Sequence, residues 1–257
     1  MTLKHLIAAG AVLALGACTA NLQTTSGADY LARYDASHEL VNGQASQVDE
    51  DVRRIAAIEP TLSFPARIGL ARVQNGRLTA LPADEARIWQ DVVDDLGDTY
   101  GALVPVSPLI ASMVREANPS GMDRSAAVIA HIRRGAARQH LDYVLAYEVG
   151  SSTEEKANAL ALADLTVIGM FVLPSRTIEV EAAASGLMLD VRTGYPYATL
   201  TTYADKGGVS RVISDASTSR SYVDTAEERA VAKLAEEFGG AMAELAERAS
   251  ELAGQGE

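Results

Sequence analysis

The side chain with the clearest chemistry in this sequence is the thiol of Cys18, the single cysteine of the chain. It follows a positive start at Lys4, an apolar run over Leu6–Leu15 and small residues up to Ala17. This order of segments is typical of a secretory signal peptide. The apolar run is too short to span a bilayer, which takes about 20 apolar residues. We therefore predict a signal over residues 1–17, cleaved between Ala17 and Cys18.

Cys18 stands where a small residue would otherwise complete the cleavage site, and Leu15-Gly16-Ala17-Cys18 resembles a lipobox. In a lipobox the cysteine thiol is diacylated, and the cysteine becomes the first residue of the mature protein. The alternative is an ordinary signal peptide with an incidental cysteine. The lipobox interpretation predicts a lipid anchor in the cell envelope. Thr19 is not the Asp that retains lipoproteins at the inner membrane, which favours the outer membrane, facing the periplasm.

The amino-acid composition restricts which partners, how many domains and which cysteine-based sites the protein can have. The 257 residues carry 34 Asp and Glu against 22 Lys and Arg, a formal net charge of −12. Such a surface repels phosphate backbones, which argues against nucleic acid as a partner. The length after the signal allows one or two domains with a sizeable core. If Cys18 is acylated, no thiol remains for a disulfide, a cysteine metal site or a nucleophile.

The remaining residues with reactive side chains form no recognisable catalytic or metal-binding set. His5 is lost with the signal, and the other histidines are His38, His131 and His140. Their spacing matches neither His-Glu-x-x-His nor a two-histidine, one-carboxylate site, so we predict no metal. No Gly-x-Ser-x-Gly elbow is present, and Gly207-Gly208 lacks the Lys-Ser/Thr of a phosphate loop. We predict no catalytic residues and no cofactor, and a non-standard enzyme site stays an alternative.

Periodicity and turn residues predict the elements of the fold. Strands are expected at 67–73, 103–106 and 143–149, with helices at 82–96 and 123–139 between them. A hairpin follows at 177–190 and 197–203, with a bulge at Ser185-Gly186. A loop over 206–221 then precedes a long helix, which a capping box starts at Thr225. The expected class is α/β (α+β), β-α-β-α-β followed by a β-hairpin and a long C-terminal helix, in a single mixed sheet packed by helices.

The composition of the N-terminal segments predicts the domain organisation. Residues 1–17 are the signal, 18–60 a tether with a short helical segment, and 61–257 a single α/β domain. The tether prediction rests on residues 19–30, which are small and polar. The short helix is expected over 48–58, stopped by Pro60.

One segment breaks the pattern of an ordinary sheet domain. Residues 157–174 are almost wholly apolar or small, yet too short to span a bilayer. They are either a buried element that closes the sheet or a hydrophobic element that docks onto the membrane or a partner. The residues expected at such a contact are Leu165, Val167, Ile168, Met170, Phe171, Val172 and Leu173.

Three stretches carry a resemblance to known envelope proteins. Ala137–Val149 and Ala184–Gly194, which ends in Leu-Asp-Val-Arg-Thr-Gly, resemble lipoproteins of the curli-secretion, penicillin-binding-protein-activator and TolB N-terminal type. Together with Leu165–Pro174 the sequence resembles the rhombotarget lipoprotein family. The resemblance implies an envelope address and an α/β fold, and it carries no catalytic residues to transfer.

These observations lead to one expected function and two alternatives. We expect a lipid-anchored lipoprotein that faces the periplasm, whose non-catalytic domain binds another envelope component. Its partners are then the membrane, through the lipid, and an envelope protein. The alternatives are a hydrolase with a non-standard site, and an accessory or pore subunit of an envelope secretion assembly.

Overall fold

A computed structural model describes residues 19–38, 47–113, 124–151, 180–205 and 216–254. Its strands are β1 (Thr19–Leu22), β2 (Ala66–Gln74), β3 (Arg77–Thr79), β4 (Gly101–Pro105), β5 (Tyr143–Ser151), β6 (Val180–Asp190) and β7 (Pro196–Asp205). Its helices are α1 (Gly27–His38), α2 (Gln47–Ala56), α3 (Ala83–Leu96), α4 (Pro108–Ser112), α5 (Arg124–Arg138) and α7 (Ala216–Gly254). None of these helices is both long and apolar enough to cross a membrane.

The strands form one mixed sheet in the order β1-β7-β6-β5-β2-β3, with β4 also paired to β2. β2 is parallel to β4 and β5, whereas the β6–β7 hairpin and β1 add antiparallel pairs. β5 lies in the interior of the sheet and is buried on both faces over Tyr143–Glu148. The predicted class, a single mixed sheet packed by helices, is confirmed, as is the order β-α-β-α-β, hairpin, long helix.

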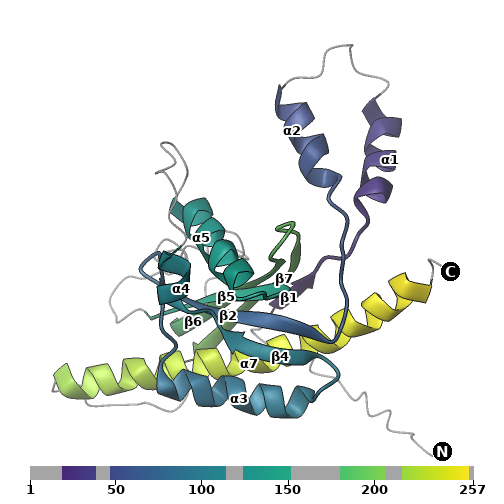
Figure 1. Cartoon of the computed structure of the whole chain (residues 1–257). Coiled ribbons are helices and arrows are strands. Elements are labelled where there is room, and N and C mark those ends of the chain that lie inside the picture. Colours follow the sequence, from purple (N-terminus) through teal and green to yellow (C-terminus); the bar gives the residue numbers. More distant parts are fainter. Residues whose placement is uncertain (1–18, 39–46, 114–123, 152–179, 206–215, 255–257) are drawn as a thin grey trace, which may run out of the picture.

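Helices cover the two faces of the sheet (Figure 1). α3 and α7 lie on one face, where the core includes Leu145, Trp89 and Phe238. α5 covers part of the other face through Val128 and Ile132, both on the predicted apolar side of that helix. Alternate residues of each strand therefore contribute to two separate hydrophobic layers, as the two-residue period of a strand requires.

Residue types that tolerate a positive φ stand where the backbone needs one. Asn75 and Gly76 form the tight turn between β2 and β3 with φ values of 52° and 69°. Gly97 ends α3 with φ of 68°, as a helix C-terminus favours. Pro105 lies at the end of β4, which pairs only with β2 among the described strands and is thus an edge strand.

The prediction of a bulge at Ser185-Gly186 is wrong. Both residues keep regular pairing with β5 and β7, and the irregularities of β6 lie near its two ends. Gly186 has a packing reason instead. A Cβ atom there would lie 3.2 Å from Leu145 Cδ1 and 3.5 Å from Leu234 Cδ1, so the missing side chain makes room for α7 against the sheet.

The predicted start of the last helix is also wrong. α7 begins at Ala216, so Thr225 lies inside the helix and residues 216–221 are helical rather than loop. Serine and threonine reduce helix propensity only modestly, and a helix held by tertiary packing extends through them. The helix buries one face in the core, which includes Val231, Leu234, Phe238, Met242 and Leu245.

The tether prediction fails from its first described residue. Thr19–Leu22 pair in antiparallel register with Ala198–Thr201 of β7. Without β1, β7 would expose an edge of unpaired backbone groups, and any extended segment can satisfy such an edge through its own backbone. Small polar side chains therefore did not mark a flexible segment here. α1 follows at Gly27, and the short helix expected over 48–58 is confirmed as α2.

Candidate functional site

The residues that the sequence singles out lie outside the described part of the chain. They are Ala17 and Cys18, and the apolar residues Leu165, Val167, Ile168, Met170, Phe171, Val172 and Leu173. The structure does describe the residues that flank them, which are Thr19 on one side and Ser151 and Val180 on the other. The lipidation and contact predictions therefore stay predictions, but their points of attachment to the fold are defined.

Ser151 and Val180 lie at one end of the sheet, and β1 runs away from that end. Thr19 pairs with Thr201, which pairs with Ser185, which in turn pairs with Glu148 of β5. Thr19 therefore lies at about mid-length of β6 and β7. In sequence Cys18 directly precedes Thr19. The chain thus enters β1 from the side of the sheet where Ser151 and Val180 lie.

At the opposite end the chain leaves the sheet as two helices that lie side by side beyond it (Figure 1). We call α1 and α2 the arm. At its base the backbones are tightly packed, because a Cβ atom on Gly27 would lie 2.3 Å from the carbonyl oxygen of Ala56. Glu59 caps α1 by accepting the backbone N–H groups of Gly27 at 3.1 Å and Ala28 at 2.8 Å. The hydrogen bond from Ala28 is the main reason that the pKa of Glu59 lies below its usual value.

Tyrosine hydroxyls fix the segment that returns from the arm to β2. The Tyr197 hydroxyl accepts the Thr61 N–H at 2.9 Å. The Tyr143 hydroxyl accepts the Ser63 N–H at 2.8 Å and donates to the Thr61 carbonyl at 3.1 Å. Burial raises the pKa of Tyr197 to about 12. The base of the arm is thus bound to the core by the hydroxyl groups of two buried tyrosines.

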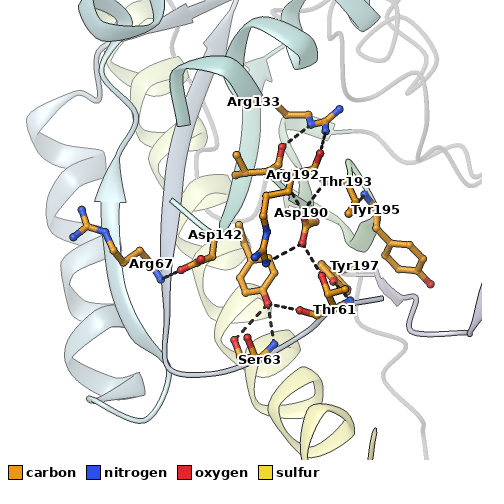
Figure 2. Close-up of polar contacts among 12 residues, drawn as sticks. Thr61, Ser63, Arg67, Arg133, Asp142, Asp190, Arg192, Thr193, Tyr195 and Tyr197 are labelled. Carbon is orange, nitrogen blue, oxygen red and sulfur yellow. Dashed lines mark hydrogen bonds and ion pairs between the residues drawn. The ribbon is translucent and has the colours of Figure 1, made fainter. Parts of the chain in front are cut away.

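Asp190 completes this group from the end of β6 (Figure 2). Its Oδ1 accepts the backbone N–H groups of Arg192 and Thr193, both at 2.7 Å. Its Oδ2 accepts the Thr61 hydroxyl at 3.2 Å and lies 3.7 Å from Arg192 Nη2. Arg133 donates to the carbonyl oxygens of Val191 and Arg192. Because both carboxylate oxygens are engaged and the side chain is fully buried, Asp190 has a structural role.

A second polar cluster lies inside the α3/α7 face of the sheet. Arg72 Nε donates to both oxygens of Glu85, at 2.8 and 2.9 Å. The Tyr147 hydroxyl donates to Glu85 Oε2 at 2.5 Å. Burial is the main reason that the pKa of Tyr147 is raised. Arg72 and Glu85 are 7% and 6% exposed and Tyr147 is fully buried, so this cluster ties α3 to β2 and β5 without access for a substrate.

Sequence reasoning missed this second cluster, although one signal was present. Glu85 lies in the first turn of α3, where an acid is ordinary because the helix dipole favours it. Arg72, however, occupies an inward position of β2, in phase with Ile68 and Leu70. An arginine in such a position requires a buried acceptor, and the nearest acids along the chain are those that begin α3.

The histidines do not come together. His131 is half-buried on α5, and His140 is exposed just beyond that helix with φ of 56°. His38 ends α1 in the arm. Within the described ranges, no group of three or more His, Cys, Asp or Glu side chains is arranged to hold a metal ion.

Comparison with solved structures finds similar chains, and a PelC protein is among them. No protein-family model matches the chain, and no curated protein matches it. A solved PelC dodecamer from Paraburkholderia phytofirmans is similar over 68% of this chain and 89% of that one, at 14% sequence identity and a TM-score of 0.31. A similarity this low carries no argument about function, so function must be argued from the residues of this chain.

Proposed function

We propose that this protein is an envelope lipoprotein, acylated at Cys18, whose non-catalytic α/β domain is held at the membrane and binds another envelope component. The proposed address is the outer membrane, facing the periplasm. The resemblance to rhombotarget lipoproteins belongs to the same proposal.

The observation that carries this proposal is the start of β1 at Thr19. An extended chain covers at most about 3.6 Å per residue, so a lipid on Cys18 would lie next to the sheet edge. The end of the sheet that contains Ser151 and Val180, from whose side the chain enters β1 at Thr19, would then face the bilayer. The predicted contact residues Leu165–Leu173 would enter and leave the fold on that side.

Two further observations support this proposal. Among the buried carboxylates, Glu85 and Asp190 have partners within the fold and serve its packing, which favours a binding module over an enzyme. The net charge of −12 gives the domain no electrostatic attraction to anionic lipid, so the acyl chains must supply the anchoring.

The experiment that tests the anchor compares wild type, Cys18→Ser and the matched control Thr19→Ser in cells. We expect incorporation of labelled fatty acid and membrane fractionation for wild type and Thr19→Ser, and loss of both for Cys18→Ser. Fatty-acid labelling that survives in Cys18→Ser would overturn the proposal.

A second experiment separates the lipid from the apolar segment. If Cys18→Ser no longer incorporates labelled fatty acid but stays in the membrane fraction, the lipid is not what keeps the protein at the membrane. Deletion of residues 159–173 in that background should then release the protein. A deletion variant that unfolds cooperatively would identify the segment as an interaction element, whereas loss of cooperative unfolding would identify it as core.

A further inference from the structure

One helix of the arm exposes a stripe of large apolar side chains. On α2, Val48 is 69% exposed, Val52 39% and Ile55 60%. These residues are spaced i, i+4 and i+7, so they lie on one face of the helix. The arm leaves the sheet at the end opposite Ser151 and Val180, and β1 runs toward that end from Thr19. The stripe therefore lies on the side away from the proposed lipid, which argues against a bilayer as its occupant.

The charges of α2 are divided along its length in a way that indicates the occupant. The first half carries Asp49, Glu50 and Asp51, and the second half carries Arg53 and Arg54. Because successive helical residues turn by about 100°, Asp49 and Arg53 lie on one flank of the stripe. Asp51 and Arg54 lie on the other flank. Each flank therefore has an acid toward the helix N-terminus and an arginine toward the C-terminus.

This arrangement is complementary to itself when reversed. We propose that α2 pairs with α2 of a second copy of this chain, antiparallel, about a two-fold axis near Val52. Val52 then meets Val52 of the second copy, and Val48 meets Ile55. On one flank Asp49 faces Arg53 of the second copy, and on the other Asp51 faces Arg54. A parallel pairing would place acids beside acids and arginines beside arginines.

The charged side chains of α2 already have interactions within the described fold, and contacts with a second copy would be shared with them. Asp49 and Arg53 have interactions of their own. Arg54 Nη2 lies 3.0 Å from Asp51 Oδ1, and both of these side chains are largely exposed. An exposed pair of this kind contributes only about 0–1 kcal/mol, so its members can also contact a second copy. The apolar stripe supplies the attraction, and the charges select the antiparallel direction.

The size of the stripe sets the strength of the association. A helix of 10 residues is about 15 Å long, whereas a stable interface buries about 800 Å² per partner. The pairing is therefore weak for protein free in solution. Two copies anchored in one membrane share a higher effective concentration, which strengthens it; this enhancement alone depends on the proposed lipid anchor.

Cysteine cross-linking of the full chain in membranes tests the pairing. Val52→Cys, close to the axis, should give a disulfide-linked dimer under mild oxidation, at least about fivefold more than Glu50→Cys on the opposite face of α2. Val48→Cys and Ile55→Cys should cross-link weakly alone and strongly when the two variants are co-expressed. Equal dimer from Val52→Cys and Glu50→Cys, or none from Val52→Cys, would overturn the proposal.

Charge exchange gives an independent test in the Val52→Cys background. Asp49→Arg with Asp51→Arg should reduce the dimer several-fold, and adding Arg53→Asp with Arg54→Asp should restore it. Failure of this rescue, or cross-linking of Val52→Cys to a different protein instead, would contradict self-pairing. The wild-type chain, whose single cysteine is Cys18, is the control: a dimer there reports a disulfide through an unacylated Cys18 thiol. Only dimer in excess of that amount is assigned to Val52→Cys.

Discussion

Glu85 and Asp190 are both buried carboxylates, and the fold neutralises them in different ways. The carboxylate of Glu85, on α3, accepts hydrogen bonds from the guanidinium of Arg72 on β2 and from the hydroxyl of Tyr147 on β5. Its negative charge is therefore balanced by a cationic side chain from another element. Asp190 instead accepts two backbone N–H groups of its own turn and the hydroxyl of Thr61. Its cationic neighbour Arg192 is 62% exposed.

The two carboxylates therefore differ in which charged side chain would lose its partner if the carboxylate were removed. Loss of Glu85 strands the Arg72 charge inside the α3/α7 face of the sheet. Loss of the Asp190 charge strands none, because Arg192 can be solvated. Glu85 is therefore part of a charge pair that must be kept or removed as a unit, whereas Asp190 is a hydrogen-bond acceptor for a turn.

The largest effect should come from Glu85→Ala. An unpaired buried charge costs about 3–5 kcal/mol, so the free energy of unfolding in urea should fall by that amount. The double variant Arg72→Met with Glu85→Met should keep most of the stability, because apolar replacement of a buried pair is often neutral. A loss no larger than that of the exposed control Asp84→Ala would contradict the charge-pair interpretation.

Asp190→Asn should have an intermediate effect. The amide keeps one acceptor oxygen but loses the charge that strengthens the bonds from Arg192 and Thr193, a cost of about 1.5–3 kcal/mol. Urea denaturation against the exposed control Asp91→Asn measures it. If Asp190→Asn destabilised the protein as much as Glu85→Ala, the contrast between the two carboxylates would disappear.

Tyr197→Phe isolates the phenol beside Asp190 and should cost about 1 kcal/mol, the value of one hydrogen bond. The pKa of Tyr197 is raised from 10 to about 12. A raised pKa stabilises the fold fully below pH 10, and this contribution is lost as the pH rises to about 12. Unfolding measured between pH 9 and 12 should therefore show a shallower alkaline loss in the variant. If the free energy of unfolding falls equally steeply between pH 9 and 12 in wild type and variant, tyrosines other than Tyr197 cause the alkaline loss.

The smallest effect is expected at Glu59, an exposed carboxylate that accepts backbone N–H groups as Asp190 does. Glu59→Gln should cost about 0.5–1 kcal/mol, as loss of a helix cap does. The lowered pKa of Glu59 means that its contribution is present above about pH 4.5, the usual value, and fades as the pH falls through the lowered pKa. Hydrogen exchange of the Ala28 backbone amide should be faster in Glu59→Gln than in wild type at pH 7. The two exchange rates should become equal at acidic pH.

Much of the fold was predictable because its signals are local. The nearly continuous apolar run over Tyr143–Val149 and the turn at Asn75-Gly76 depend on residues within a few positions of one another. The start of α7, the reason for Gly186 and the pairing of β1 depend on neighbours far along the chain. Leu234 decides the size of residue 186, and the free edge of β7 decides that Thr19–Leu22 is a strand.

The candidate sites divide in the same way. The sequence by itself determined the prediction of acylation at Cys18, because a signal layout and a single cysteine are adjacent features of the chain. It also determined the charge halves and apolar spacing of α2. Only the tertiary structure decided that β1 runs from Thr19 toward the end of the sheet where the arm leaves, since strand register relates Thr19 to Thr201, far along the chain. Under the two proposals, that register separates the side that would face the membrane from the side that would pair with a second copy.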